Sequence, residues 1–395
     1  MDIDDIIINT QIYISNNAKR HVCIGNNILY WIQLNINIIN SKHAKIISKY
    51  SKYLNQRDAK IVRKYIRHKI NVVPILYQLR YDDIKLLIEK SFKHANVHML
   101  RILHNYIIKL VDHNVLIKHM KSACKNDNLN VIKYLHQEIC LTKKDFQANN
   151  NGACQWACRN GHVNVVKYLH QEIGLTKQDF QSDDNYACKY ACENGRLNVV
   201  KYLHQKVGLT KQDFQSDDNY ACRWACENGH INVVKYLHQE IELTKQDFQS
   251  ANNYACKFAC YCGHNSCAVL KTIYNRRHNY VVKYLHREIG LTKQDFQAHN
   301  NLACRWACQD GYFDVVKYLH QEIKLTKEDF QSKNNCACQL ACQNGHTNVV
   351  EYLHRKIGLT KKDFQSDDNL AYKLACNNDH KCVVKYLIDT IGIFS

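Results

Sequence analysis

The sequence predicts an all-α repeat solenoid, and the spacing of one recurring phrase carries that prediction. The phrase Lys-Tyr-Leu-His, or a close variant of it, begins at Lys133, Lys167, Lys201, Lys235, Lys283, Lys317, Glu351 and Lys385. Successive starts are 34 residues apart, except for a step of 48 residues between Lys235 and Lys283. A fixed period of this length is typical of stacked units that bury their apolar faces against one another. We therefore expect about eight regular units of 34 residues, preceded by one or two degenerate ones.

The first helix of each unit is predicted from a stripe of small side chains. In the unit from Asp184 to Asp217, these side chains recur at helical spacing on one face. They are Ala187, Cys188, Ala191 and Cys192. Small side chains let neighbouring helices approach closely. Gly195 is expected to end the helix, because glycine readily adopts the left-handed conformation at this position.

A second helix and a capped turn are predicted to complete the unit. The second helix is expected to begin near Asn198. Its apolar positions are Val199, Val200, Leu203 and Val207. After it, Thr210 and Asp213 have the spacing of a capping box, with Asp in the place that Glu usually takes. We expect a third helix of one turn here, with Leu209 and Phe214 packed on either side.

The phrase at 221–237 reads Ala-Cys-Arg-Trp-Ala-Cys-Glu-Asn-Gly-His-Ile-Asn-Val-Val-Lys-Tyr-Leu and resembles the ankyrin repeat. In that family a Thr-Pro-Leu-His-x-Ala-Ala helix is followed by Gly-His and a Val-Val-x-x-Leu-Leu helix. Gly-His recurs at Gly161, Gly229 and Gly345. A tetratricopeptide array also has a period of about 34 residues. It needs longer helices and a proline near the turn, whereas the only proline here is Pro74.

The repeat phrases are also similar to those of ankyrin-repeat paralogues encoded by giant amoeba-infecting, mimivirus-like DNA viruses. This resemblance implies a viral protein that acts inside the host cell, in the host cytoplasm. The chain departs from the family pattern in two ways. The Leu-Thr-Lys-x-Asp-Phe turn is expected to replace the usual hairpin finger. Three helix turns are expected to be less uniform than the rest, namely Gly195-Arg196, Gly311-Tyr312 and Asp379-His380.

The repeat phrases also predict how the chain is organised. We expect an irregular region at 1–55, degenerate helical capping repeats at 56–118 and the repeat array at 119–395. The longer step in the fifth unit indicates an insertion at 265–278, which should project from the helix-turn edge with Arg276 and Arg277 exposed.

The charge is concentrated in the first third of the chain. Residues 1–120 carry 19 Lys or Arg against 8 Asp or Glu, a net charge of +11 out of +18. Four of these cations share one predicted helix face: Lys60, Arg63, Lys64 and Arg67. The alternative function is therefore nucleic-acid association through residues 45–70. The acidic start and the lack of a long apolar run predict a protein that is neither secreted nor membrane-spanning.

Cysteines and histidines recur once or twice in every unit. Pairs such as Cys188 and Cys192 share one helix face, which suits either core packing or half of a zinc site, and packing is favoured. Among the cysteines, the cluster of Cys262, His264 and Cys267 is the best candidate for metal binding. The repeated His of Lys-Tyr-Leu-His is interpreted as a partly exposed position copied by duplication. No catalytic motif or cofactor site is apparent, so we expect no enzyme activity and no cofactor.

The resemblance implies a protein-protein interaction scaffold that binds its partner on the concave face, along the first helices. The partner is expected to be a protein rather than nucleic acid or membrane, and the chain to be a monomer. Positions that vary between otherwise constant units are the candidates, and Tyr and Arg often dominate binding energy. The predicted partner-binding residues are Tyr186, Lys189, Glu193, Tyr220, Arg223, Glu227, Tyr254, Lys257, Leu302 and Arg305.

Overall fold

The computed structural model describes residues 81–261 and 268–393, and every regular element among them is helical. The chain divides into two compact units, one ending at Val111 and the other beginning at Asp112. Each is described by itself. The predicted basic face and the alternative nucleic-acid segment at 45–70 lie outside the described residues. In the described part, no helix is both long and apolar enough to cross a membrane.

The described part of the first unit contains three helices. They are α6 (Tyr81–Lys93), α7 (Val97–Ile102) and α8 (His104–Leu110). Ala95 between α6 and α7 has a φ of 51°, and the Asn96 side chain caps α7 by accepting a hydrogen bond from the Met99 N–H at 3.1 Å. This left-handed residue gives α6 and α7 the same kind of connection that joins helix pairs in the second unit. It fits the proposal that this segment is a degenerate repeat.

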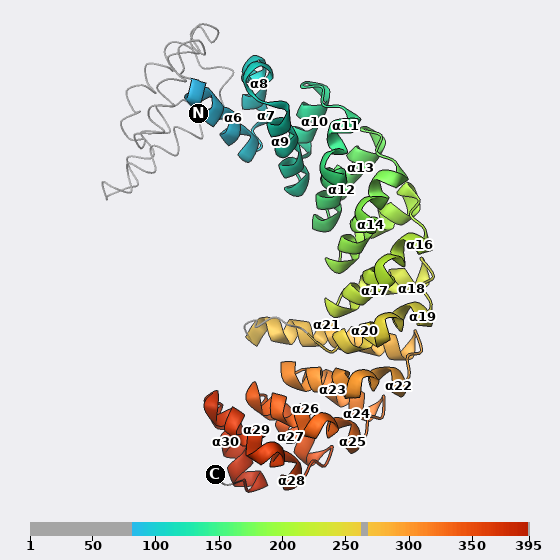
Figure 1. The fold of residues 1–395 in the computed structure, drawn as a ribbon, viewed down its shortest axis with the longest axis vertical. Helices are drawn as coiled ribbons and strands as arrows, with labels where there is room; N and C mark the ends of the chain where they lie inside the picture. The colour runs from blue at the N-terminus through green and yellow to red at the C-terminus, as the bar shows by residue number, and fades with distance from the viewer. Residues whose placement is uncertain (1–80, 262–267, 394–395) are drawn as a thin grey trace, which may run out of the picture. The chain divides into compact units, whose positions relative to one another are not determined.

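Eight helix pairs follow one another in the described part of the second unit, which confirms the predicted solenoid (Figure 1). The first helices are α9 (His113–Lys125), α12 (Ala148–Asn160), α14 (Lys177–Glu193), α17 (Ser216–Glu227), α20 (Ser250–Phe258), α23 (Ala298–Asp310), α26 (Ser332–Gln343) and α29 (Ser366–Asn377). The second helices are α10 (Leu129–Gln137), α13 (Val163–Gln171), α15 (Leu197–Tyr202) with the π-helical turn η2 (Leu203–Val207), α18 (Ile231–Gln239), α21 (Ala268–Arg287), α24 (Phe313–Gln321), α27 (Thr347–Arg355) and α30 (Lys381–Tyr386) with η3 (Leu387–Ile391).

Small side chains form the core between neighbouring first helices, as predicted. Ala187, Cys188, Ala191 and Cys192 are fully buried, and so are their counterparts in the other interior units. Because Ala and Cys have short side chains, the helix backbones of successive units pack closely. Burial raises the pKa of these thiols, and the Cys188 thiol donates to the Asp213 carbonyl at 3.5 Å. The cysteines therefore serve as core residues, which is the reading the sequence favoured.

The predicted one-turn helices are present and lie along one edge of the stack (Figure 1). They are α11 (Lys143–Phe146), the first turn of α14, α16 (Lys211–Phe214), α19 (Lys245–Phe248), α22 (Lys293–Phe296), α25 (Lys327–Phe330) and α28 (Lys361–Phe364). Each has the capping box; in α16 the Thr210 N–H donates to the Asp213 carboxylate at 2.7 Å. Leu209 and Phe214 are buried on either side.

The capping Asp also joins each repeat to the one before it, which the sequence analysis did not foresee. The Gln181 side-chain amide donates to the second oxygen of Asp213 at 2.7 Å, and Lys177 forms an ion pair with Asp213 at 3.3 Å. Equivalent Gln–Asp bonds recur at every described junction from Gln147–Asp179 to Gln331–Asp363. Burial alone would raise the pKa of Asp213, but these donors and the Thr210 N–H hold it below its usual value.

A left-handed turn of three residues follows each capped turn and lies within the bounds given above for the next first helix. Asp217, Asp218 and Asn219 have φ values of 55°, 51° and 61°. Seven such turns occur in the described residues, all closing on Asn. Non-glycine residues in this region cost about 1–2 kcal/mol each, and Asn and Asp tolerate it best. That tolerance explains why this segment is rich in Asn and Asp.

The Gly-His turns hold successive repeats together through the histidine. The His346 ring donates to the Gln309 carbonyl at 2.9 Å, at the end of the preceding first helix. A Cβ added to Gly311 would lie 2.5 Å from the His346 ring, so the preceding glycine leaves room for it. Arg196 makes the same connection, donating to the Arg159 carbonyl at 3.2 Å.

The expectation that three of these turns would be less uniform is wrong. The first residue of each is left-handed, with φ of 67° at Gly195, 72° at Gly311 and 54° at Asp379. The next residues also match: ψ is 61° at Arg196 and 74° at Tyr312, against 71° at His162. The backbone turn is set by the helices it connects, so only the side chain differs.

The repeated histidine of Lys-Tyr-Leu-His is not a passively copied position. Its imidazole shares a hydrogen bond with the Tyr hydroxyl of the following repeat, at 2.9 or 3.0 Å in each of seven junctions. In the same junctions the ring lies edge-on to the buried Phe of its own capped turn, as His204 does to Phe214. The repeated phrase therefore encodes a bond between units.

The fifth unit contains the longer step, and its second helix, α21, begins well before those of its neighbours. In Figure 1 its N-terminal end projects from the edge opposite the capped turns. Aligning Val281 with Val233 places His278 at the position of the turn histidine His230, so the repeat resumes at His278. His278 is fully buried and donates to the Ala259 carbonyl at 2.9 Å. Residues 262–267, including Cys262, His264 and Cys267, lie outside the described part.

Candidate partner-binding surface

A continuous series of ring contacts crosses the first helices of four successive repeats. It consists of Tyr186, Tyr190, Tyr220, Trp224, Tyr254, Phe258 and Trp306, which we call the aromatic stripe. Contacts alternate within and between repeats: ring centroids are 3.8 Å apart for Tyr186 and Tyr190 and 5.8 Å apart for Tyr190 and Tyr220. At the far end, Phe258 and Trp306 are 4.6 Å apart.

All seven rings of the stripe are half-buried, so each packs against its neighbours and still presents one side to solvent. Helical geometry explains the arrangement. Within one helix, residues four apart lie on the same face, as Tyr186 and Tyr190 do on α14. The close stacking of the first helices then brings the rings of the next repeat into contact. The result is an ordered surface of large amphipathic side chains.

Hydrogen bonds fix the hydroxyl groups of the stripe. The Tyr220 and Tyr254 hydroxyls donate to Glu193 and Glu227 at 2.6 Å, in each case one repeat earlier. Burial and the adjacent Glu carboxylates raise the pKa of both tyrosines. At the N-terminal end, Arg159 donates to the Tyr186 hydroxyl at 3.2 Å. The guanidinium of Arg159 also stacks over Tyr190, 5.1 Å from the ring centroid.

Three of the four predicted cations form hydrogen bonds or ion pairs with the left-handed turns. Lys189 is buried and forms an ion pair with Asp217 of the next repeat at 3.3 Å. Arg223 donates to the Asp217 carbonyl at 2.7 Å. Arg305 donates to the His299 carbonyl at 3.0 Å. Their variation between units therefore reflects different ways of fixing the same turn as well as any contact with a partner.

The sequence pattern matches a family model along most of the array. The model is described as ankyrin repeats (3 copies), and it matches residues 120–213, 156–247, 189–275 and 305–394. This chain belongs to the ankyrin repeat family. Its helix pairs form an ankyrin array in which helical capped turns stand between repeats.

One solved structure similar to this ankyrin array is that of an ankyrin repeat family protein from Legionella pneumophila. It is 16% identical, with a TM-score of 0.32, and the alignment covers 96% of this chain and 93% of that chain. No curated protein matches this sequence.

The rings at the centre of this ankyrin surface were not among the residues predicted from the sequence. Tyr190, Trp224, Phe258 and Trp306 occupy one helix position, which Trp156 fills in the preceding repeat, and none of these residues was predicted. This helix position lies between the predicted positions represented by Lys189 and Glu193, and large apolar side chains fill it in most repeats. The structure brings the predicted tyrosines and glutamates together with these rings. Leu302 is also half-buried, but it stands where the preceding repeats have a tyrosine, so the tyrosine column ends there.

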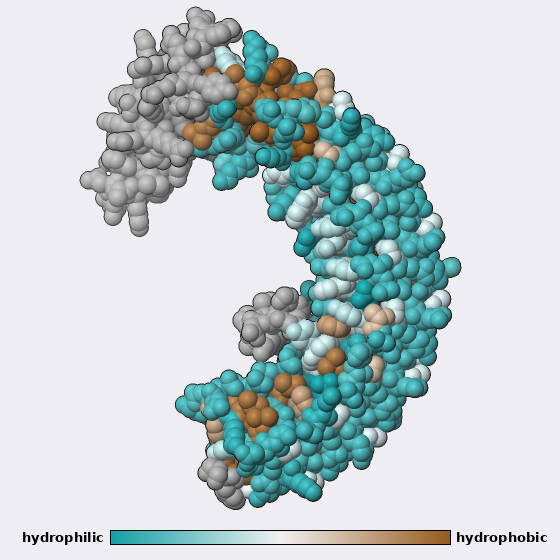
Figure 2. Space-filling model, viewed as in Figure 1, coloured by the Kyte–Doolittle hydropathy of each residue, from teal (hydrophilic) through white to brown (hydrophobic). Residues whose placement is uncertain are grey.

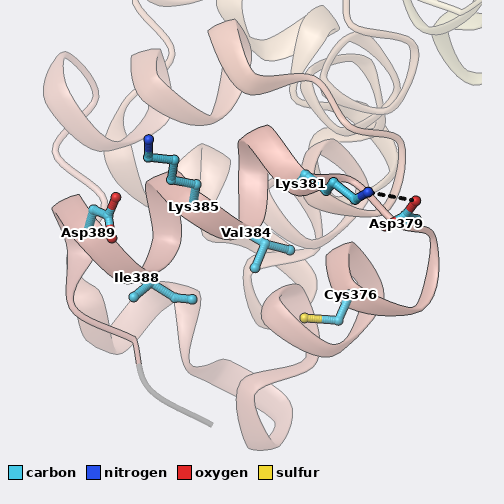
Figure 3. A pocket seen from close by; sticks show the side chains of 7 residues that line it. All are labelled: Cys376, Asp379, Lys381, Val384, Lys385, Ile388 and Asp389. Atoms are coloured by element: carbon cyan, nitrogen blue, oxygen red, sulfur yellow. Dashed lines mark ion pairs between the residues drawn. The ribbon is translucent and has the colours of Figure 1, made fainter.

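A pocket of about 530 Å³ lies at the last ankyrin repeat, between α29 and the helix formed by α30 and η3 (Figure 3). Val384 and Ile388 line it, and Lys381 pairs with Asp379 at its rim at 3.8 Å. Ile388 stands where the other repeats have the bonded histidine, so the series of His–Tyr bonds ends here. The visible surface is more hydrophobic over these C-terminal repeats than over the repeats in the middle of the array, and a second hydrophobic area lies over the first described helices (Figure 2).

Metal binding was the other chemical reading of the cysteines. Within the described ranges, no group of three or more His, Cys, Asp or Glu side chains is arranged to hold a metal ion. The paired cysteines of the first helices instead lie in the core, and in five of the pairs the first thiol donates to a backbone carbonyl of the next capped turn, as Cys222 does to Asp247 at 3.6 Å.

Proposed function

We propose that this ankyrin repeat protein is a non-enzymatic interaction scaffold that binds a partner protein on the aromatic stripe. Ankyrin repeats are in general protein-protein interaction modules, and the stripe supports this role for the present chain. The observation that carries the proposal is the unbroken series of half-exposed rings from Tyr186 to Trp306. Large exposed aromatic groups of this kind are characteristic of binding sites.

The stripe is suited to binding because its rings are already ordered. Neighbouring rings and the Tyr–Glu bonds fix the side chains before a partner arrives, so association loses little side-chain entropy. Tyr and Trp also combine a large apolar surface with a polar group. In the repeats beyond the stripe, the equivalent residues are Leu340 and Leu374, and at its start the tyrosine position is Gly152. The binding surface is therefore centred on α14, α17, α20 and α23.

The proposal also concerns the identity of the partner and the origin of the chain. The similarity of the repeat phrases to viral ankyrin-repeat proteins supports a partner in the host cytoplasm and an origin in a virus, and these two points rest on that similarity alone. We propose that the chain acts as a monomer, with the variable predicted residues at the margin of the stripe adding specificity.

Affinity capture tests the proposal directly. Wild-type protein and the variant Trp224→Ala/Trp306→Ala are used to capture proteins from host-cell extract, and the amount of each captured protein is compared by mass spectrometry. The matched control is Gln205→Ala/Gln239→Ala, which changes two exposed residues of the second helices. We expect captured partners to fall about tenfold or more with the stripe variant, because central aromatic residues contribute most of the binding energy. Partners retained by the stripe variant and lost by the control would place the site elsewhere.

A further inference from the structure

Lys257 differs in its contacts from the residues at the same helix position in other repeats. Six other repeats contain a left-handed turn and are compared with it. The six counterparts each hydrogen-bond to a residue of such a turn. They are Gln155, Lys189, Arg223, Arg305, Gln339 and Lys373. Lys257 makes no hydrogen bond or ion pair with any residue that the structure describes, although only 6% of its surface is exposed.

The acidic partners that the pattern provides elsewhere are replaced around Lys257. Lys189 pairs with Asp217, the first residue of the next left-handed turn, whereas His299 takes that place after Lys257. The two preceding units have a glutamate at the end of the first helix, Glu193 and Glu227, and Tyr261 stands at that position in this unit. Both substitutions remove negative charge from the same part of the surface.

The remaining charges nearby do not compensate for Lys257. Glu227 on the preceding helix accepts the Tyr254 hydroxyl, and Arg305 on the following helix adds a second cation. Asp310 ends α23, about one and a half helical turns beyond Arg305. Burial lowers the pKa of Lys257, because the charged form loses part of its hydration. A desolvated cation of this kind is costly unless it is paired.

We propose that Lys257 binds a carboxylate of the partner, an Asp or Glu side chain in an acidic segment that lies along the aromatic stripe. The inference rests on the proposed function, and it specifies the chemistry of the partner at the stripe. The helix position of Lys257 lies beside the stripe in the two preceding repeats, where the Lys189 ammonium is 5.5 Å from the Tyr220 ring centroid and the Arg223 guanidinium is 4.9 Å from that of Tyr254. An acidic segment with apolar neighbours matches this combination of one unpaired cation and several rings.

A carboxylate fits this cation better than a phosphate. Phosphate recognition in proteins relies on bidentate Arg groups and on backbone N–H groups at helix termini. Arg305, the nearby guanidinium, is engaged with the backbone carbonyls of His299 and Asn300. A single Lys ammonium with a neighbouring apolar surface suits one carboxylate side chain.

Peptide display provides a defined probe. A library of random peptides is selected on the wild-type protein, and binders are retained only if the stripe variant Trp224→Ala/Trp306→Ala abolishes their binding. One retained acidic peptide and its analogue, in which the acid is replaced by the amide, are then labelled and titrated by fluorescence anisotropy. On wild-type protein, the amide analogue is expected to bind about tenfold to a hundredfold more weakly, as for other hydrogen bonds to charged groups.

Three variants assign that difference to Lys257. Lys257→Met removes the charge and should abolish the discrimination between acid and amide. Lys373→Met is the matched control, because it removes the cation at the same position of α29, away from the stripe, that already has Asp368 as its partner, and it should leave the discrimination intact. His299→Asp supplies Lys257 with the internal partner found at Asp217, and it should weaken the acidic peptide alone. Asp tolerates the left-handed backbone there, as Asp217 shows with a φ of 55°.

The possible failures are distinguishable. If no selected peptide depends on the stripe, the proposed function is overturned. If stripe-dependent peptides show no preference for an acid, or keep that preference with Lys257→Met, the carboxylate site is overturned while the stripe keeps its role. Loss of folding does not confuse these results, because replacing an unpaired buried cation by Met is expected to leave the unfolding temperature unchanged or to raise it.

Discussion

The imidazole of His204 and the hydroxyl of Tyr236 share a hydrogen bond of 3.0 Å across the junction between two repeats. Both residues belong to the same recurring phrase, one copy apart. In each interior copy, the His therefore bonds to the following repeat and the Tyr bonds to the preceding one. Stability in such an array depends largely on nearest-neighbour interfaces. A residue that serves every junction is retained in every copy for that reason.

Removing this bond at one junction should cost about 1 kcal/mol of unfolding free energy. Tyr236→Phe removes only the hydroxyl, and His204→Leu removes the ring nitrogen. Chemical denaturation of both single variants and the double variant gives the coupling energy between the two side chains. We expect the double variant to be less destabilised than the sum of the single ones. Strict additivity would show that the bond contributes nothing to the junction.

Glycine in the Gly-His turn should be required for two separate reasons. Gly345 has a φ of 73°, and a Cβ there would lie 2.5 Å from the His380 ring of the next repeat. Gly358, which lies just before a capped turn and outside the Gly-His turns, is the comparison. It has a φ of 81°, but no atom lies within 4 Å of an added Cβ. Gly358→Ala should cost about 1–2 kcal/mol for the left-handed backbone alone.

Gly345→Ala should cost more than Gly358→Ala by about 1–3 kcal/mol, because the histidine must move and give up its bond to the Gln343 carbonyl. Thermal unfolding of the two variants measures the difference. Equal losses would mean that the turn accommodates the methyl group without disturbing the junction.

The capping Asp should matter more than the acidic residues beside it. Asp213 accepts hydrogen bonds from Thr210 and Gln181 and pairs with Lys177, so one carboxylate serves two repeats. Asp213→Asn should destabilise the fold by about 2 kcal/mol, since hydrogen bonds to charged groups are lost. Asp218→Asn, on the exposed left-handed turn, is the control and should change stability by less than about 0.5 kcal/mol. Comparable losses from both would remove the special role of the capping Asp.

The repeat unit could be predicted from the sequence because its signals are local. The small-residue stripe of Ala187 and Cys188, the turn at Gly195 and the capping box of Thr210 and Asp213 each depend on residues only a few positions apart. These features are read from periodicity and capping rules alone. They correspond to the helices and capped turns of the structure.

The bonds between repeats could not be predicted in the same way. His204 meets Tyr236, and Gln181 meets Asp213, only because the second helices and capped turns stack in register. Their spacing of 32 residues has no meaning until that register is known. The candidate surface was missed in part for the same reason. Tyr190 and Trp224 were not chosen because contact between rings on adjacent helices is a property of the stack.

Two histidines, the buried His278 and the half-buried His230, should make the array sensitive to mild acid. Burial lowers the pKa of His230 and His278 to about 4, with the nearby Arg277 charge acting in the same direction. Burial also lowers the pKa of four histidines in the His–Tyr bonds: His170, His286, His320 and His354. In the unfolded chain a histidine has a pKa of about 6.5. The unfolded state therefore binds protons at a higher pH than the folded state.

The fold should be fully stable above about pH 6.5 and lose stability as the pH falls from there towards 4. At pH 5, His230 and His278 should each account for a loss of about 2 kcal/mol. Below about pH 4 the capping carboxylates add to the loss, because the pKa of residues such as Asp213 and Asp363 is also lowered in the fold. Unfolding temperatures measured between pH 7.5 and 3 test this order.

His278→Asn separates the buried histidine from the other groups. Asn can still donate to the Ala259 carbonyl, but it does not titrate, and protonating His278 would leave a buried charge facing the neighbouring His230 and Arg277. The variant should be less stable than wild type at pH 7.5 and should lose less stability on going to pH 5. A slope equal to that of the wild type over this interval would show that His278 does not couple folding to protonation.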